Sequence, residues 1–180
     1  MKALDARREW SRSARSGSEP PPILVLGLGN PILGDDGVGW KVAEELQKSG
    51  NLPADVDVTC LALGGISLME ALEGYQKAIL IDAIQTSQAP IGSVSAFNLE
   101  GMSNPFLGHL SSAHDTSLQN ALRIGRDLGV QLPAEIIVIA IEAEKVYEFS
   151  EELSPPVLAA VPLAVEWVEK LIHGQEGRAE

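Results

Sequence analysis

The sequence predicts an α/β fold: a three-layer α/β/α sandwich built on a twisted, mostly parallel, five-stranded sheet. Short apolar runs alternate along the chain with segments in which apolar residues recur at helical spacing. Three of these runs carry almost no polar residue, which is typical of parallel strands buried on both faces; they are 23–27, 78–82 and 136–141. Strands that alternate with helices indicate a parallel sheet with helices on each side.

The first half of the chain contains three predicted strands and two predicted helices, whose ends are marked mainly by glycine or proline. Gly27 closes the first strand, Asn51-Leu52-Pro53 ends the first helix, and Gly64-Gly65 follows the second strand. The third strand ends at Asp82. The predicted strands are 23–27, 56–61 and 78–82, and the predicted helices are 37–48 and 66–73.

The second half begins with residues 93–97, whose polar and apolar side chains alternate as in an edge strand. Residues 100–113 are rich in Gly, Ser and Asn, which predicts a loop. Gly129 is placed to stop the helix before it, and two prolines lie in the first turn of the last helix. The remaining predicted elements are a helix at 115–128, a strand at 135–141 and a helix at 155–172.

The length of 180 residues fits one domain, which we assign to residues 23–172 as a single α/β domain. Residues 1–22 are rich in Ser, Arg and Pro and offer almost nothing to bury, so we expect a disordered leader. Residues 173–180 form a polar tail.

The charge and the cysteine content narrow the classes of function. The net charge is −12, and from position 23 onward 22 acidic side chains face 8 basic ones, a balance that disfavours nucleic acid as a partner. Cys60 is the single cysteine, so neither an internal disulfide nor a Cys-rich zinc site is possible. No apolar run is long enough to span a bilayer, and no secretory signal opens the chain. We expect a cytoplasmic monomer without membrane insertion.

Two carboxylates are predicted to meet at one end of the sheet. Ligands of open parallel sheets bind beyond the carboxyl ends of the strands, where the strand order reverses. In the common order 2-1-3-4-5, the first and third strands are neighbours at that reversal. Asp36 opens the first helix and Asp82 closes the third strand, so both would face the same crevice. Like charges at close range need a cation or a proton between them.

A metal ion would resolve that conflict, and His114 is the candidate for a third ligand. It lies on the Gly/Ser-rich loop just before a predicted helix, with His109 as a nearby competitor. Two carboxylates and one imidazole suit a borderline divalent ion and leave coordination positions open for water or substrate.

Each of these residues also has a structural interpretation. Acidic residues at a helix start cap its exposed N–H groups, and we expect Asp35 to cap the first helix while Asp36 points into the crevice. Asp82 ends an otherwise apolar strand, which fits a structural and a functional role equally. Cys60 lies within a strand and is predicted to be a small core residue.

The glycine-rich turn also raises two rival functions. Gly27-Leu28-Gly29-Asn30-Pro31-Ile32 begins like a dinucleotide fingerprint, but Ile32 stands where the third glycine belongs. A non-catalytic metal- or nucleotide-binding module is therefore one alternative. The string Gly-Leu-Gly-Asn-Pro also resembles the opening of peptidyl-tRNA hydrolases, but no histidine follows before His109 and the chain is acidic.

Taken as a whole, residues 23–39 resemble the N-terminal signature of hydrogenase maturation proteases, in which a strand and a Gly-x-Gly-Asn turn lead into an acidic pair at a helix start. The resemblance extends over most of 23–172. It includes Gly64-Gly65, the Asp-Ala step Asp82-Ala83, Pro90-Ile91-Gly92, Ser112-Ala113-His114, and Glu142-Ala143-Glu144, where the family has Glu-Pro-Glu.

This resemblance implies an endopeptidase that removes a C-terminal extension from the large-subunit precursor of [NiFe] hydrogenase after nickel insertion. It implies that Asp36, Asp82 and His114 are the catalytic and metal-binding residues. The implied cofactor is Ni²⁺ supplied by the precursor, so the isolated enzyme can be metal-free. We also expect a set of loop residues to contact the substrate; this set is Gly29, Asn30, Asp35, Gly64 and Gly65.

Overall fold

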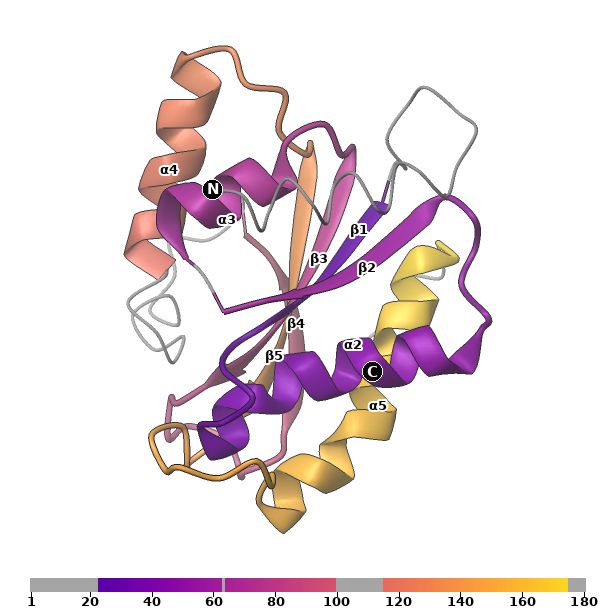
Figure 1. Cartoon of the computed structure of the whole chain (residues 1–180), viewed down its shortest axis with the longest axis vertical. Helices are drawn as coiled ribbons and strands as arrows, with labels where there is room; N and C mark the ends of the chain where they lie inside the picture. Colours follow the sequence, from indigo (N-terminus) through magenta and orange to yellow (C-terminus); the bar gives the residue numbers. More distant parts are fainter. Residues whose placement is uncertain (1–22, 63, 100–114, 175–180) are drawn as a thin grey trace.

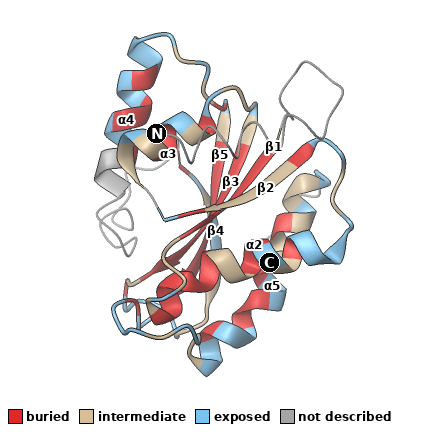
Figure 2. Ribbon diagram, viewed as in Figure 1, coloured by how far each residue is buried: buried red, intermediate tan, exposed pale blue. Residues whose placement is uncertain are grey.

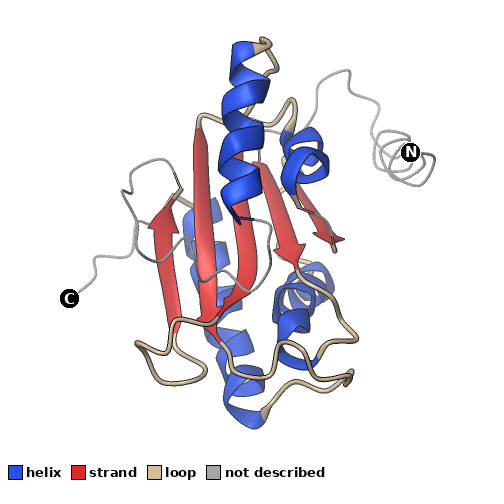
Figure 3. Ribbon diagram, turned by 90° about the vertical axis from the view of Figure 1, so that its left-hand side faces the viewer, coloured by secondary structure: helices blue, strands red, loops and turns tan. Residues whose placement is uncertain are grey.

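A computed structural model of the chain describes residues 23–62, 64–99 and 115–174. The predicted leader 1–22, the predicted loop 100–113 and most of the polar tail lie outside these ranges. The described residues form a twisted five-stranded sheet between two helical layers (Figures 1 and 3), which confirms the predicted fold class. Within these ranges, no helix combines the length and the apolar character that a membrane span requires.

Every predicted strand and helix is present. The strands are β1 (Ile23–Leu28), β2 (Val56–Leu61), β3 (Lys77–Ile84), β4 (Val94–Asn98) and β5 (Glu135–Glu142). The helices are the short 3-10 helix η1 (Gly34–Gly37), α2 (Val38–Ser49), α3 (Gly65–Leu72), α4 (Asp115–Asp127) and α5 (Pro155–Ile172).

One predicted stop signal and one predicted strand end were wrong, although α2 ends within one residue of its predicted end. Helix α2 stops one residue before Gly50, whose φ of 66° ends the helix in the left-handed conformation, so Asn51-Leu52-Pro53 is not needed to stop it. Strand β3 runs past Asp82 to Ile84, because β5 is long enough to pair with it as far as Glu142.

The strands follow the order β2-β1-β3-β5-β4, with β4 antiparallel to β5 and all other pairs parallel. The predicted neighbours β1 and β3 are confirmed. The order 2-1-3-4-5 was wrong for the last two strands, because the strand that is fourth in sequence lies at the edge. Burial explains the exchange: β5 is buried along nearly its whole length, whereas β4 is exposed or half-buried throughout.

The two faces of the sheet carry separate apolar cores (Figure 2). Alternate residues of β1 and β3 point to opposite faces, so Leu26 and Leu80 pack beneath α3 and α4 while Val25 and Ile79 pack beneath α2 and α5. Asp82 has the same parity as Leu80 and therefore faces the α3–α4 layer.

Glycines allow the start of α2 to lie directly on the strand ends. A Cβ atom at Gly39 would lie 2.3 Å from the carbonyl oxygen of Ile81 on β3 and 2.4 Å from that of Leu28 on β1. A Cβ atom at Gly27 would in turn lie 2.3 Å from the carbonyl oxygen of Gly39. Only a residue without a side chain fits there, so the first turn of α2 is fixed against both strands.

We expect Gly39→Ala to lower the free energy of unfolding by about 3 kcal/mol or more, because the methyl group meets backbone that cannot easily move. Gly50→Ala is the matched control: its Cβ would meet nothing within 4 Å, so only the strain of its φ of 66° remains, about 1–2 kcal/mol. Urea denaturation of both variants measures the difference. Equal losses would show that close packing at Gly39 is unimportant.

Candidate functional site

The buried polar side chains gather at one end of the sheet. Each of them lies in η1, in the last residues of β3 or β5, or just after β3. All of these positions are at the carboxyl end of the parallel strands. Among the described residues the buried polar or charged side chains are Asp35, Asp36, Asp82, Thr86 and Glu142. Burial of polar groups is costly without partners, so this end of the sheet is built around specific interactions.

Asp36 lies in η1 and is held by the turn that precedes it. Its side chain is 8% exposed, and its Oδ2 atom accepts a hydrogen bond of 2.6 Å from the backbone N–H of Asn30. Gly29 makes this turn possible, because it has a φ of 111° and a Cβ there would lie 1.8 Å from the backbone oxygen of Asp36. The turn and the carboxylate form one packed unit.

Asp82 lies on β3, beside the end of β1. Its side chain is 4% exposed, and its Oδ1 atom accepts a hydrogen bond of 2.9 Å from the backbone N–H of Ala83. Because Gly27 pairs with Ile81, the next residue of β1, Leu28, lies level with Asp82. The carboxylate is therefore placed by strand register.

The two carboxylates flank the same turn. η1 contacts β3, and the backbone at Leu28 and Ile81 lies against the first turn of α2. Asp36 and Asp82 are thus at the same end of the sheet, as predicted from the neighbouring positions of β1 and β3.

Asp35 has a different role from the predicted one. Neither η1 nor α2 has a side-chain cap, so the expectation that Asp35 caps the first helix was wrong. Its fully buried carboxylate instead accepts hydrogen bonds from Ser154 N–H (2.7 Å), Ser154 Oγ (3.0 Å) and Lys145 N–H (3.2 Å). Ser154 is the N-cap residue of α5, so Asp35 ties the β5–α5 loop to the turn that carries Asp36.

Glu142 is a buried carboxylate to which sequence reasoning gave no role. It is 2% exposed and accepts hydrogen bonds of 2.7 Å from Thr86 N–H, Thr86 Oγ1 and Ser87 N–H. These bonds hold Ser87 at a φ of 57°, a left-handed conformation that is unfavourable for serine. The signal that could have found Glu142 is the one used for Asp82, an acidic residue at the end of an apolar strand.

The backbone N–H of Ala143, which stands where the resemblance leads us to expect proline, donates a 2.8 Å hydrogen bond to Ile84 O. Proline has no N–H and could not make this bond. The loop after β5 therefore continues the pairing with β3 for one more residue.

The predicted third ligand, His114, and its competitor His109 lie outside the described residues. Helix α4 begins at Asp115, and its starting end lies toward the carboxyl ends of the parallel strands (Figure 1). In the part of the chain that the structure describes, no three His, Cys, Asp or Glu side chains form a group able to hold a metal ion. The assignment of His114 stays a prediction.

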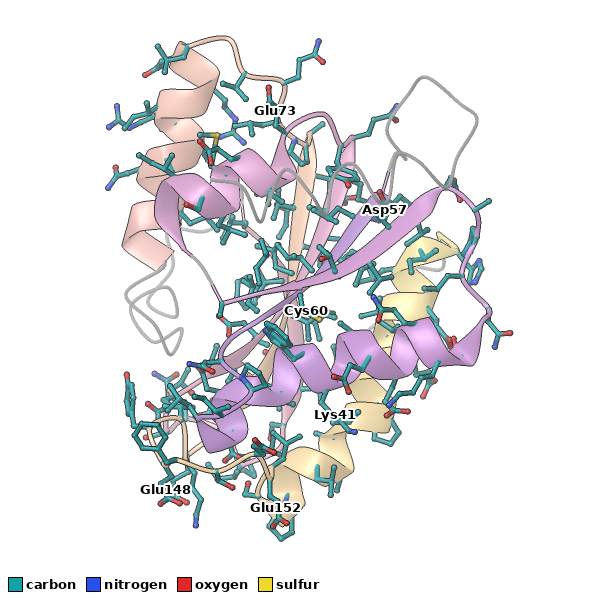
Figure 4. All side chains as sticks on the ribbon, viewed as in Figure 1. Lys41, Asp57, Cys60, Glu73, Glu148 and Glu152 are labelled. Atoms are coloured by element: carbon teal, nitrogen blue, oxygen red, sulfur yellow. The ribbon has the colours of Figure 1, made fainter. Side chains whose placement is uncertain are left out.

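The other candidate residues divide between this end and the sheet edge. Gly64 precedes α3 and Gly65 is its first residue, with a φ of 58°, so both follow the carboxyl end of β2. Cys60 is half-buried on the edge strand β2 (Figure 4), which corrects its prediction as a core residue.

Comparison with known proteins gives one consistent result. A family model for hydrogenase maturation protease matches residues 40–171. The chain is 27% identical over 145 residues to the hydrogenase expression/formation protein HoxM of Azotobacter vinelandii, covering 81% of this chain and 69% of that protein.

Solved structures agree. The hydrogenase maturating endopeptidase HybD from E. coli superimposes with a TM-score of 0.73 at 25% identity, covering 84% of this chain and 92% of that one. The [NiFe] hydrogenase maturation protease HybD from Thermococcus kodakarensis gives a TM-score of 0.65 at 30% identity, covering 83% and 98%.

We expect Asp35→Ala to destabilise the protein by about 3 kcal/mol or more, because it leaves three loop donors without their acceptor. Ser154→Ala is the matched control, since it removes only the hydroxyl bond and should cost about 1 kcal/mol. Thermal and urea unfolding measure both. If Asp35→Ala lowers the stability no more than Ser154→Ala does, the buried Asp35 carboxylate does not hold the loop.

Proposed function

The chain belongs to the hydrogenase maturation protease family, and on this premise we propose that it is a nickel-dependent endopeptidase. It removes a C-terminal extension from the large-subunit precursor of [NiFe] hydrogenase after nickel has been inserted. Family membership makes the chain a hydrolase and the precursor its substrate. The observation that carries the nickel dependence is the pair of nearly buried carboxylates, Asp36 and Asp82, at the junction of β1, β3 and α2.

In this proposal, Asp36, Asp82 and His114 are the ligands that the protease offers to the metal. The two carboxylates come from rigid elements, because one is fixed by the Gly29 turn and the other by strand register. His114 immediately precedes α4, whose start lies toward the same end of the sheet. Two oxygen donors and one imidazole nitrogen fit a borderline divalent ion such as nickel, and they leave positions for ligands from the precursor.

Nickel enters this site as part of the substrate. Because three protein ligands are too few to fill its coordination sphere, we expect the isolated enzyme to bind nickel weakly. A precursor without nickel lacks the group that the three ligands recognise. Cleavage then depends on completed metal insertion, which is the order that maturation requires.

The residues of the chain itself position the scissile peptide and move protons. Bound nickel supplies Lewis acidity toward the peptide carbonyl or a water molecule. In this proposal, either Asp36 or Asp82 accepts a proton from the attacking water as the general base. We assign the backbone N–H groups around Gly64-Gly65, at the start of α3, to contact with the substrate chain or the developing oxyanion.

We also propose that the enzyme is cytoplasmic and monomeric and does not act on nucleic acid. Its substrate acquires nickel inside the cell, and the net charge of −12 repels phosphate backbones. The peptidyl-tRNA hydrolase alternative loses its support, since the similarity to maturation proteases extends over most of the chain while the Gly-Leu-Gly-Asn-Pro string is local.

We expect Asp82→Asn and His114→Ala each to reduce processing of the nickel-loaded precursor by at least about 100-fold, because each removes a metal ligand. Both variants should keep the circular dichroism spectrum of the parent. Cys60→Ser is the control and should process at the parental rate. Normal processing by Asp82→Asn and His114→Ala would refute the ligand assignment, and loss of activity in Cys60→Ser would point to a thiol mechanism.

Nickel dependence is tested by incubating the protease with nickel-loaded and nickel-free precursor and measuring the product by mass spectrometry. We expect a truncated product from the loaded precursor only. Addition of Ni²⁺ to the protease alone, followed by removal of the free ion, should not restore cleavage of the nickel-free precursor. Equal cleavage of both forms would contradict the role of nickel.

A further inference from the structure

Three large apolar side chains project from the surface beside the candidate site. Phe149 is 87% exposed, Tyr147 74% and Ile32 47%. Tyr147 and Phe149 belong to the loop between β5 and α5, and Ile32 belongs to the turn between β1 and η1. We call these three residues the apolar ledge. Phe149 is the most exposed large hydrophobic residue in the part of the chain that the structure describes.

The ledge is fixed to the body of the protein. Ser150 N–H donates to Ile32 O at 3.1 Å and Gly34 N–H donates to Ser150 O at 2.7 Å, which joins the loop to the turn through a short parallel bridge. Between the ledge and β5, the side chain of Val146 is 1% exposed and packs into the α2–α5 core. The backbone that carries the exposed aromatic rings is therefore fixed before Tyr147 by buried Val146 and after Phe149 by the hydrogen bonds of Ser150.

The same contacts connect the ledge to the candidate site. Asp35, adjacent to Asp36, holds the loop at Lys145 and at Ser154, one on each side of the aromatic residues. Figure 1 shows the β5–α5 loop beside the turn that leads from β1 into α2. A protein bound to the ledge would lie next to the carboxylates that we assign to the metal.

Acidic residues flank Tyr147 and Phe149 along the β5–α5 loop. Glu144, Glu148, Glu151 and Glu152 are all exposed, and the single basic residue of this loop, Lys145, already pairs with Glu148 at 3.4 Å. Glu148 and Glu152 mark this rim in Figure 4. An apolar centre with a negative rim is complementary to an apolar depression bordered by Lys or Arg.

We propose that the apolar ledge is the docking surface for the folded body of the hydrogenase large-subunit precursor. This inference rests on the proposed function and identifies the surface of the enzyme that holds the substrate. A specific protein complex needs a contact of about 800 Å² on each partner, far more than a single extended peptide at the metal ligands provides. Exposed aromatic residues with little conformational freedom are the usual anchors of such contacts, and charged rims set the rate of association.

The test compares steady-state processing of nickel-loaded precursor by the full-length parent, by the double variant Tyr147→Ser/Phe149→Ser and by Leu128→Ser. Leu128 is the matched control: it is 77% exposed but follows α4, at the opposite end of the sheet from the ledge. We expect KM to rise at least about tenfold for the double variant. Its kcat should stay within about twofold, because docking contacts are equal in the ground and transition states. Leu128→Ser should match the parent.

A second variant, Glu151→Lys/Glu152→Lys, tests the rim without removing apolar contacts. We expect it to raise KM and to weaken the dependence of kcat/KM on salt, because it reverses two charges that attract the precursor. Both positions are exposed, so the fold should be retained, and thermal unfolding checks this.

The outcomes separate the two proposals. If the parent processes the precursor and neither the ledge nor the rim variant changes KM, the docking surface is wrong and the proposed function stands. If sedimentation shows that the parent is a dimer and the ledge variant a monomer with unchanged KM, the ledge binds a second copy of the chain, which also overturns the inference. If the parent does not process the precursor at all, the proposed function fails and the inference fails with it.

Discussion

The close contact between the start of α2 and the ends of β1 and β3 is the constraint on which the rest of the site depends. Gly27 and Gly39 leave no room for a side chain, so backbone meets backbone where three elements converge. This contact fixes η1 relative to β3, and with it Asp36 relative to Asp82. A site made of groups distant in sequence needs such a rigid junction, because small displacements weaken both metal binding and catalysis.

The buried acidic residues around this junction divide into two kinds. Asp35 and Glu142 each accept three hydrogen bonds from a loop, and each thereby fixes the loop that follows a strand or precedes a helix. Asp36 accepts a hydrogen bond from the backbone N–H of Asn30 in the preceding turn, and Asp82 accepts one from the backbone N–H of Ala83 on β3. The first pair fixes loops at this end of the sheet, and the second pair consists of the carboxylates that we propose for chemistry.

Asp35 also connects the proposed metal site with the proposed docking surface. Its carboxylate reaches from the turn beside Asp36 to both ends of the loop that carries Tyr147 and Phe149. In the function that we propose, the docking surface and the metal ligands need a fixed relation, because both must engage the same precursor molecule. One buried charge with three partners provides that relation without a continuous layer of secondary structure.

The sequence by itself determined the fold class, the identity of nearly every element, the neighbouring positions of β1 and β3, and the position of Asp36 and Asp82 at one end of the sheet. These follow from local periodicity, from glycines at turns and from the rule that ligands bind at carboxyl ends of parallel strands. The tertiary structure alone decided that β5 lies inside and β4 at the edge, that β3 extends past Asp82, and that Asp35 clamps a loop instead of capping a helix. Each of these depends on a partner far away in the chain, such as Glu142 opposite Ile84 or Ser154 beside Asp35. Such pairings are selected by burial and hydrogen bonding in the folded state and leave no periodic signal in the sequence.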